Sequence, residues 1–222
     1  MALEKMIPLM LDGIRDTMYM TTVSTLFAYL LGLPLAIALV LTSPKGLAPR
    51  PVIYRVMDAV VNIFRSIPFL ILMVLVFPLS RLILGTTIGT AATIVPLTVA
   101  AAPYVARLVE ASLREMDRGV VEAAQSMGCS TWQIVTKVML PECLPSLING
   151  ATNATITILS YGAMAGNIGG GGRGAISLQR GYQRNQIIVL YVAVILLVIL
   201  VQIIQSIGTA LSVKAEKRIT HK

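Results

Sequence analysis

Charged residues are scarce in this chain. Asp, Glu, Lys and Arg make up 13% of its 222 residues, whereas a soluble domain carries about 25%. Hydrophobic residues account for 56%, and the mean hydropathy is +0.81. This balance excludes an ordinary soluble protein and favours one whose surface mostly faces lipid. Because no polar linker divides the sequence, we predict a single membrane domain, residues 1–222.

Residues that build metal, disulfide and nucleic-acid sites are also few. Two cysteines, Cys129 and Cys143, and one histidine, His221, provide neither a disulfide framework nor a set of metal ligands. Aromatic residues make up only 5%, and no nucleic-acid-binding motif is present. The net charge of +8 arises in short basic clusters between apolar runs, as in loops beside anionic lipid. We therefore expect no nucleic-acid partner, no metal and no enzymatic site on this chain.

A nucleotide site of its own is excluded as well. Gly169 and Gly174 have the spacing of the two glycines in a phosphate-binding loop. However, Ala175 and Ile176 replace the lysine and the Ser or Thr that such a loop needs. We expect these glycines to form an external turn, either a flexible one at a gate or a tightly packed one.

Long apolar runs dominate what is present. A helix of about 20 apolar residues crosses the hydrocarbon core of a bilayer, and the sequence contains five candidates. The second is the least regular, because Arg65 and Arg81 lie within it and Pro68 and Pro78 should bend it. We expect these arginines to reach opposite interfaces, Arg65 the cytoplasmic one; the alternative for Arg65 is a place along a polar path through the membrane. The fold class is an all-α membrane protein with spans at residues 17–41, 56–82, 88–108, 144–165 and 187–212.

The orientation follows from lysine and arginine, which accumulate on the cytoplasmic side of membrane proteins. The more basic side comprises the connections after the first and third spans and the C-terminal tail, with Lys45, Arg50, Arg107, Arg114, Arg118, Lys137, Lys214 and Lys217. We therefore predict that the N-terminus lies outside and the C-terminus inside. Because the N-terminal stretch lacks a small-residue cleavage site, we expect the first span to act as the insertion signal.

The longest polar connection, at about residues 110–142, separates the third and fourth spans. The Glu-Ala-Ala run at 122–124 favours a short helix, and Gly128 is suited to end it. The Ser and Thr at 130–131 can cap a second short helix, which we expect Pro141 to end. The apolar face of this second helix comprises Ile134, Val135, Val138 and Met139.

This connection resembles the EAA loop of binding-protein-dependent ABC importers, which reads Glu-Ala-Ala, three residues, Gly, nine residues, then Ile-x-Leu-Pro. Val138 stands where the family has isoleucine. The resemblance implies a coupling helix that sits in a groove of an ATPase subunit. The implied coupling residues are Glu122, Ala123, Ala124, Gly128, Val138, Leu140 and Pro141. From the residues alone, an amphipathic helix lying on lipid remains the alternative.

Three further strings resemble the methionine importer permeases: VNIFRSIPFLILM (61–73), LILGTTIGTAATIVPLTVAAAPYVARLVE (82–110) and SYGAMAGNIGGGG (160–172). This resemblance implies an ABC type I importer permease fold in the bacterial cytoplasmic (inner) membrane. It also implies a homodimer, two copies of an ABC ATPase subunit that bind ATP and Mg, and a periplasmic or lipid-anchored methionine-binding protein. The chain would form the path for D- and/or L-methionine and catalyse no reaction itself. Another amino acid or a methionine derivative is the alternative cargo.

The fourth predicted span carries a polar stripe at helical spacing, comprising Asn149, Asn153, Thr157, Ser160 and Met164. Polar side chains in lipid must face protein or a wet cavity. The stripe therefore either lines the translocation path or forms hydrogen bonds that hold the helices together. An ATP-independent secondary transporter would instead need an intramembrane carboxylate. Asp58, near one end of the second span, does not meet that need convincingly.

Overall fold

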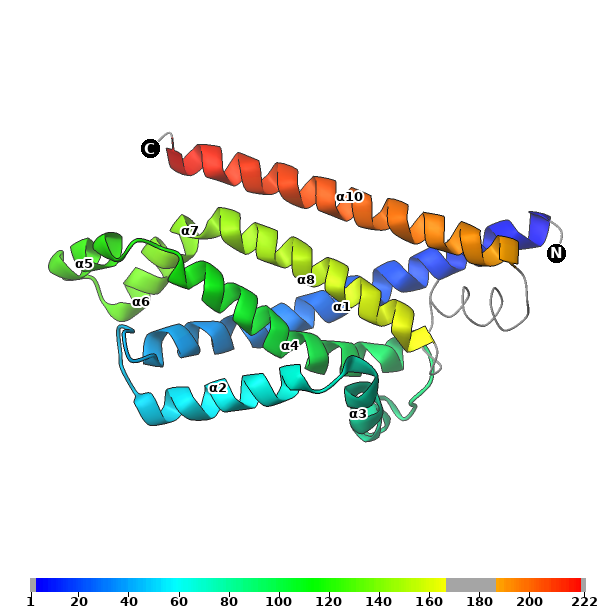
Figure 1. Ribbon diagram of the computed structural model, residues 1–222, viewed down its shortest axis with the longest axis horizontal. Helices are drawn as coiled ribbons and strands as arrows, with labels where there is room; N and C mark the ends of the chain where they lie inside the picture. The colour runs from blue at the N-terminus through cyan, green and yellow to red at the C-terminus, as the bar shows by residue number, and fades with distance from the viewer. Residues whose placement is uncertain (1–2, 167–186, 221–222) are drawn as a thin grey trace.

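The computed structural model describes residues 3–166 and 187–220, and every regular element within these ranges is helical. The all-α prediction is confirmed for this part of the chain. The long helices run along the molecule, and α3 lies across them (Figure 1). The principal helices are α1 (Leu3–Thr42), α2 (Pro51–Ser66), α3 (Phe69–Leu84), α4 (Thr90–Arg114), α8 (Leu144–Ala165) and α10 (Ile187–Thr220).

The second predicted span is broken. Instead of one helix over 56–82, α2 and α3 meet at an angle of 109°, so the prediction of one continuous helix is wrong. Ile67 is extended, with φ −80° and ψ 125°, because the ring of Pro68 disfavours the helical conformation of the residue before it. Arg65 lies in the last turn of α2, about 21 Å along the axis from Pro51 at 1.5 Å per residue. Its expected position near the basic end of the span is therefore also wrong.

The other predicted spans agree better with the helices. The bounds of α8 match the predicted 144–165, and the described part of α10, Ile187–Thr220, includes the whole predicted span 187–212. Three helical stretches are apolar and long enough to cross a membrane, namely Met10–Thr42, Thr90–Arg114 and Ile187–Lys217, and the bent pair α2–α3 adds a fourth if it counts as one span. Helix α8 has the length and no charged residue, but its polar side chains keep it outside this set.

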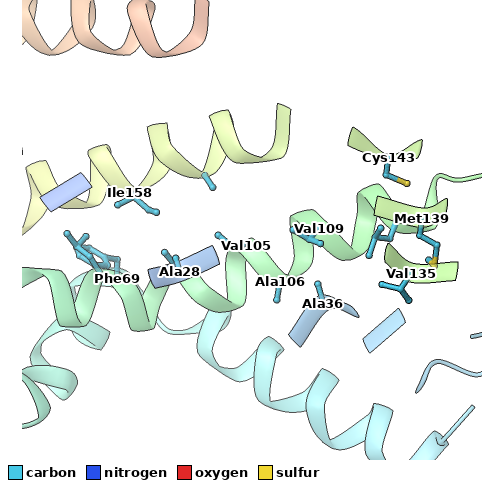
Figure 2. Close-up of a cluster of buried hydrophobic side chains, with 14 of the residues drawn as sticks. Ala28, Ala36, Phe69, Val105, Ala106, Val109, Val135, Met139, Cys143 and Ile158 are labelled. Carbon is cyan, nitrogen blue, oxygen red and sulfur yellow. The ribbon is translucent and has the colours of Figure 1, made fainter. Parts of the chain in front are cut away.

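Helix α4 forms the centre of the bundle and packs against α1, α2, α3 and α8 (Figure 1). Its contact with α1 is the closest, because a Cβ on Gly32 would lie 2.8 Å from both Ala102 O and Val105 Cγ1. The buried side chains along this seam are small or branched and include Ala28, Ala36, Val105, Ala106 and Val109 (Figure 2). Such side chains let two helices approach closely in a membrane.

Helices α3 and α10 both contact α8. At the start of α3, the ring of Phe69 stacks on Tyr161 of α8, with the ring centroids 4.4 Å apart. Helix α10 packs on α8, where Gly208 is needed because a Cβ there would overlap Thr152. The polar segment, residues 115–143, joins α4 to α8 at the end of the bundle where the α1–α2 connection also lies, and we call this the polar end.

Candidate coupling segment and polar faces

The first half of the polar segment is helix α5, Arg118–Ser126. Asp117 caps its N-terminus by accepting a hydrogen bond from Gly119 N at 2.8 Å. Gly128 ends it with φ +79°, and the N–H of Cys129 donates to Ala124 O at 3.1 Å. This is the glycine-terminated helix end expected from the sequence. The prediction of a short helix ended by Gly128 is confirmed.

The second half is a composite helix made of α6 (Thr131–Gln133), the π-helix η1 (Ile134–Met139) and α7 (Leu140–Glu142). Ser130 begins it with a capping box, in which its Oγ accepts from Gln133 N and its N–H donates to Gln133 Oε1 at 2.8 Å. Pro141 does not end this helix, so that prediction is wrong. A proline at the start of a helical turn removes no N–H that the helix needs, and the break falls at Cys143 instead.

The two halves of the polar segment are anchored by their apolar residues. Ile134, Val135 and Met139 are buried in the core that includes α1 and α4, and Val138 is half-buried against it. Ala124 is also buried, at 2% exposure. It therefore packs within this chain, whereas the sequence analysis assigned it to an outward contact.

The outward surface of the polar segment contains the rest of the motif. Glu122, Ala123, Gly128 and Pro141 are exposed, and Leu140 is half-buried. Two large apolar side chains that the sequence analysis did not single out lie on the same segment: Met127 is 77% exposed and Trp132 is 71% exposed. An apolar residue inside a polar loop is the signal that could have identified them.

A cavity of about 720 Å³ lies between α5 and the α1–α2 connection. Charged side chains on its wall are Lys45, Arg114, Arg118 and Glu122, and apolar ones include Leu113 and Met139. The expected coupling glutamate therefore lies beside a hollow in the surface at the polar end.

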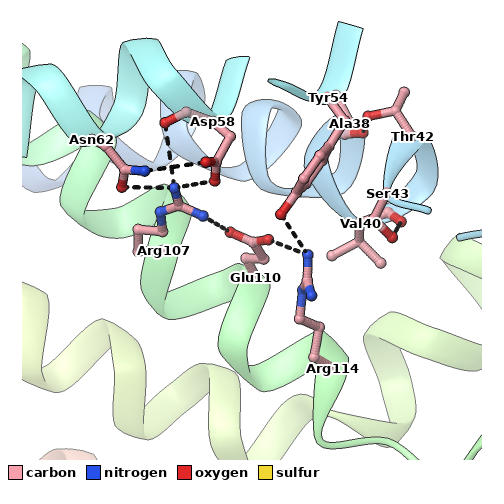
Figure 3. Close-up of polar contacts among 10 residues, drawn as sticks. All are labelled: Ala38, Val40, Thr42, Ser43, Tyr54, Asp58, Asn62, Arg107, Glu110 and Arg114. Carbon is pink, nitrogen blue, oxygen red and sulfur yellow. Dashed lines mark hydrogen bonds and ion pairs between the residues drawn. The ribbon is translucent and has the colours of Figure 1, made fainter. Parts of the chain in front are cut away.

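A network of charged residues joins α2 to α4 (Figure 3), and its member Arg114 also lines this cavity. Arg107 Nη2 lies 2.5 Å from Asp58 Oδ1 and 2.8 Å from Asn62 Oδ1, and Arg107 Nη1 lies 2.6 Å from Glu110 Oε2. Arg114 Nη2 then bonds Glu110 Oε1 at 2.7 Å. The side chain of Glu110 is only 5% exposed, so the two arginines compensate a carboxylate that would otherwise be buried alone.

Hydroxyl groups join the remaining helices at the polar end. Ser146 Oγ of α8 lies 2.9 Å from Ser112 Oγ of α4 and 3.1 Å from Glu115 Oε2. Ser212 Oγ of α10 donates to Pro145 O at 3.0 Å. A displacement of the polar segment would therefore act on α2, α4, α8 and α10 together.

The polar stripe predicted on α8 lies on one open face of this helix. Asn149, Asn153, Ser160 and Met164 are exposed, and Thr157 is half-buried. Thr157 Oγ1 donates to Asn153 O at 2.9 Å and reaches Tyr104 Oη of α4 at 3.5 Å. The Ser160 hydroxyl donates to Ile156 O of its own helix. Among the described residues, the only hydrogen bond from the stripe to another helix is thus the Thr157–Tyr104 contact.

Two other sequence predictions concern sites elsewhere. The glycine turn at 169–174 lies outside the described residues. Among residues 3–166 and 187–220, no three His, Cys, Asp or Glu side chains are grouped as metal ligands would be.

An apolar helical bundle with one exposed helical segment at its polar end has the architecture of a membrane permease subunit, a part of a transporter that a separate subunit drives. Residues 28–217 match the family described as "Binding-protein-dependent transport system inner membrane component". This match covers most of the sequence, and the chain belongs to this family. It is therefore a transport subunit and not an enzyme.

Curated relatives narrow the comparison. The chain is 48% identical over 210 residues to the probable D-methionine transport system permease protein MetI of Vibrio cholerae, covering 95% of this chain and 93% of that protein. It is 48% identical over 163 residues to the D-methionine transport system permease protein MetI of Escherichia coli K12, covering 73% of this chain and 75% of that protein.

Solved structures agree with the observed fold. A chain in an inward-facing crystal structure of the MetNI methionine ABC transporter matches with a TM-score of 0.94 and 46% identity, covering 96% of this chain and 98% of that chain. A chain of an amino acid ABC transporter crystallised with histidines matches with a TM-score of 0.78 at 19% identity, covering 96% of this chain and 97% of that chain. The second likeness shows a common fold only. The first supports the ABC type I importer permease fold predicted above.

Proposed function

We propose that this chain is the membrane-spanning subunit of an ATP-driven importer for methionine. The observation that supports this most strongly is the 48% identity, over 95% of the chain, to a permease named for D-methionine transport. D-Methionine, L-methionine or both are the proposed cargo. The whole chain, residues 1–222, forms one permease domain in the bacterial cytoplasmic (inner) membrane.

The proposed topology has five spans, with the N-terminus outside and the C-terminus inside. Helices α1, α4 and α10 supply three, the broken pair α2–α3 supplies one, and α8 supplies the fifth. The polar end then faces the cytoplasm. This agrees with its basic residues, because Lys45, Arg114 and Arg118 all line the cavity there.

The proposed partners are a second copy of this chain, two ABC ATPase subunits and a methionine-binding protein that is periplasmic or lipid-anchored. A homodimer is expected because one chain presents an open polar face that lipid cannot cover. ATP and Mg are bound by the ATPase subunits. This chain supplies the path and the contact that couples it to ATP hydrolysis.

The polar segment is the proposed contact with the ATPase. Glu122 and Ala123 on α5 and Pro141 on α7 are exposed and can face the partner. Gly128 sets the angle between the two short helices through its positive φ. Ala124, Val138 and Leu140 act from behind this surface, because they attach it to the core. Closure of the ATPases would push this segment and, through it, the long helices.

The path is proposed to run along the stripe on α8, with Met164 at the external end. Asn153 lies on this stripe, and among the described residues its side chain forms no hydrogen bond to another helix. Replacing it with alanine should reduce uptake more than assembly. Equal loss of uptake and of purified complex would assign the stripe to helix packing instead.

The proposed function is tested by purifying the chain together with its ATPase subunit and measuring uptake of labelled methionine into vesicles. Uptake should require both ATP and the binding protein. Glu122→Arg or Gly128→Pro should release the ATPase from the complex, whereas Asp12→Arg, an exposed charge reversal at the end of α1 far from the polar segment, should not. Continued uptake without nucleotide would identify a secondary transporter and refute the proposal.

Cargo is tested separately with the purified binding protein. If that protein binds methionine, the cargo assignment stands. If it binds another amino acid or a methionine derivative in preference, the chain is a permease for that compound, and the coupling proposal is unaffected.

A further inference from the structure

Helix α2 presents two exposed faces of opposite chemical character. Asp58, Asn62 and Arg65 follow an i, i+4, i+7 spacing and share one face. A second set with the same spacing lies on the opposite side of the helix, and its members Val56, Val60 and Ile63 are 59%, 47% and 60% exposed. The apolar face is suited to lipid. The polar face, which includes a carboxylate and a guanidinium, is not.

The polar face of α2 looks onto the same side of α4 as the stripe on α8. Arg107 of α4 contacts Asp58 and Asn62, while Tyr104 of α4 contacts Thr157 of α8. Tyr104 and Arg107 are three residues apart and therefore point only about 60° apart on the helix. Helices α2 and α8 thus lie on either side of the face of α4 that carries Tyr104 and Arg107.

The members of the network on α2 are exposed or partly exposed, whereas Glu110 on α4 is buried. Asn62 and Arg65 are exposed, and the side chain of Asp58 is 31% exposed. Glu110 is 5% exposed and holds the second nitrogen of Arg107. Arg107 can therefore leave Asp58 and still remain anchored by Glu110, which makes Glu110 a positioning residue.

We propose that Asp58, Asn62, Arg65 and Arg107 line the translocation path opposite the α8 stripe. The proposal rests on the proposed function for the identity of the cargo but not for the position of the path. A free amino acid is a zwitterion, with one carboxylate and one ammonium group. As it passes, its carboxylate takes the place of Asp58 on Arg107, and its ammonium group takes the place of Arg107 on Asp58. The ion pair between Asp58 and Arg107 thus separates while a zwitterion passes and forms again afterwards.

The position of these four path-lining residues, which we call the α2 wall, is tested by cysteine labelling. The labelling uses the complete complex with its ATPase subunits, in vesicles. Cys129 and Cys143 are first replaced by alanine, and Asn62→Cys and the matched control Val60→Cys are introduced one at a time. Both positions are exposed in the chain and lie two residues apart, on opposite sides of α2.

A charged methanethiosulfonate reagent should modify Asn62→Cys at least about tenfold faster than Val60→Cys, because only a water-lined surface admits a charged reagent. The rate at Asn62→Cys should also change when ATP is added. Equal rates at the two positions, faster labelling of Val60→Cys, or no labelling of Asn62→Cys would overturn the proposal, because the polar face would then be closed by protein or facing lipid.

The role of the charged pair is tested by the ratio of substrate transported to ATP hydrolysed. Asp58→Asn keeps the size of the side chain and removes its charge, so this ratio should fall about tenfold while yield and thermal stability stay close to those of the unchanged complex. A purely structural pair would lower uptake, hydrolysis and stability together, and that result would overturn the proposed exchange. If the unchanged complex does not transport methionine but shows the expected labelling pattern, the cargo assignment is refuted. The position of the α2 wall is then still supported.

Discussion

Helix α4 packs against α1 and against α2 in chemically different ways. We call these two contacts the apolar seam and the charged seam. Against α1, α4 presents small and branched apolar side chains, and the backbones approach so closely that Gly32 has no room for a Cβ. Against α2, the same helix presents charged side chains held by hydrogen bonds between 2.5 and 2.8 Å. Close packing has one well-fitted arrangement, whereas charged pairs can exchange partners. The apolar seam therefore fixes the bundle, and the charged seam is the one that can change.

The largest effect is expected at the apolar seam. Gly32→Leu should prevent assembly, because even its Cβ would lie 2.8 Å from Ala102 O, and overpacking of this kind costs about 3 kcal/mol or more. Yield of folded protein and thermal unfolding in detergent measure the effect. The matched control is Gly150→Ala, where the nearest atom to the new Cβ would be Leu108 Cβ at 3.7 Å, an ordinary contact. A folded Gly32→Leu protein with unchanged stability would show that this seam is not tight.

A smaller but still large effect is expected where the charged seam is buried. Glu110→Gln leaves Arg107 and Arg114 without their shared carboxylate, and removing one partner of a buried ion pair costs about 3 kcal/mol. Thermal unfolding of the purified complex measures it. Glu115→Gln is the control, because Glu115 is exposed and its contact is a single bond from Ser146. Equal destabilisation by the two substitutions would contradict a buried role for Glu110.

A third effect, of intermediate size, concerns the polar segment that extends from α4. Gly128 has φ +79° and no atom within 4 Å of a potential Cβ, so substitution there meets backbone strain and no steric clash. Gly128→Ala should cost about 1 kcal/mol, and Gly128→Asn should cost less because asparagine tolerates this conformation. Co-purification of the ATPase at rising temperature measures both. If alanine and asparagine weakened the complex equally, strain at this φ would not be the cause.

The sequence allowed the regular parts of this fold to be predicted, because local signals determine them. The bounds of α8 and the short helices around Gly128 follow from hydrophobic runs, caps and a glycine stop. The 109° break between α2 and α3 could be predicted only as a bend. Pro68 explains where the helix stops, but the direction of α3 depends on tertiary contacts such as the stacking of Phe69 on Tyr161.

The candidate sites were predictable to different degrees for the same reason. The motif around Glu122 is contiguous in sequence, so its position was evident, but the burial of Ala124 depends on a core that the motif does not reveal. Asp58 and Arg107 lie 49 residues apart, and no local pattern pairs them. Arg65 was misplaced because the predicted span began at residue 56, whereas α2 begins at Pro51.

The smallest effect is expected at Cys143, where the polar segment meets α8. This residue belongs to neither the apolar nor the charged seam. Burial, together with the nearby carboxylates of Glu142 and Glu115, raises the pKa of this thiol to about 11. Because only the thiolate reacts, a Cys129→Ser protein should be alkylated slowly at pH 7 by a neutral reagent. The rate should rise about tenfold per pH unit until the pH nears the thiol pKa. Glu142→Gln removes one of the two charges and should shift this profile slightly to lower pH. A plateau reached near pH 8 would show that the thiol is open to water, and that the junction between the polar segment and α8 is looser than the apolar seam it adjoins.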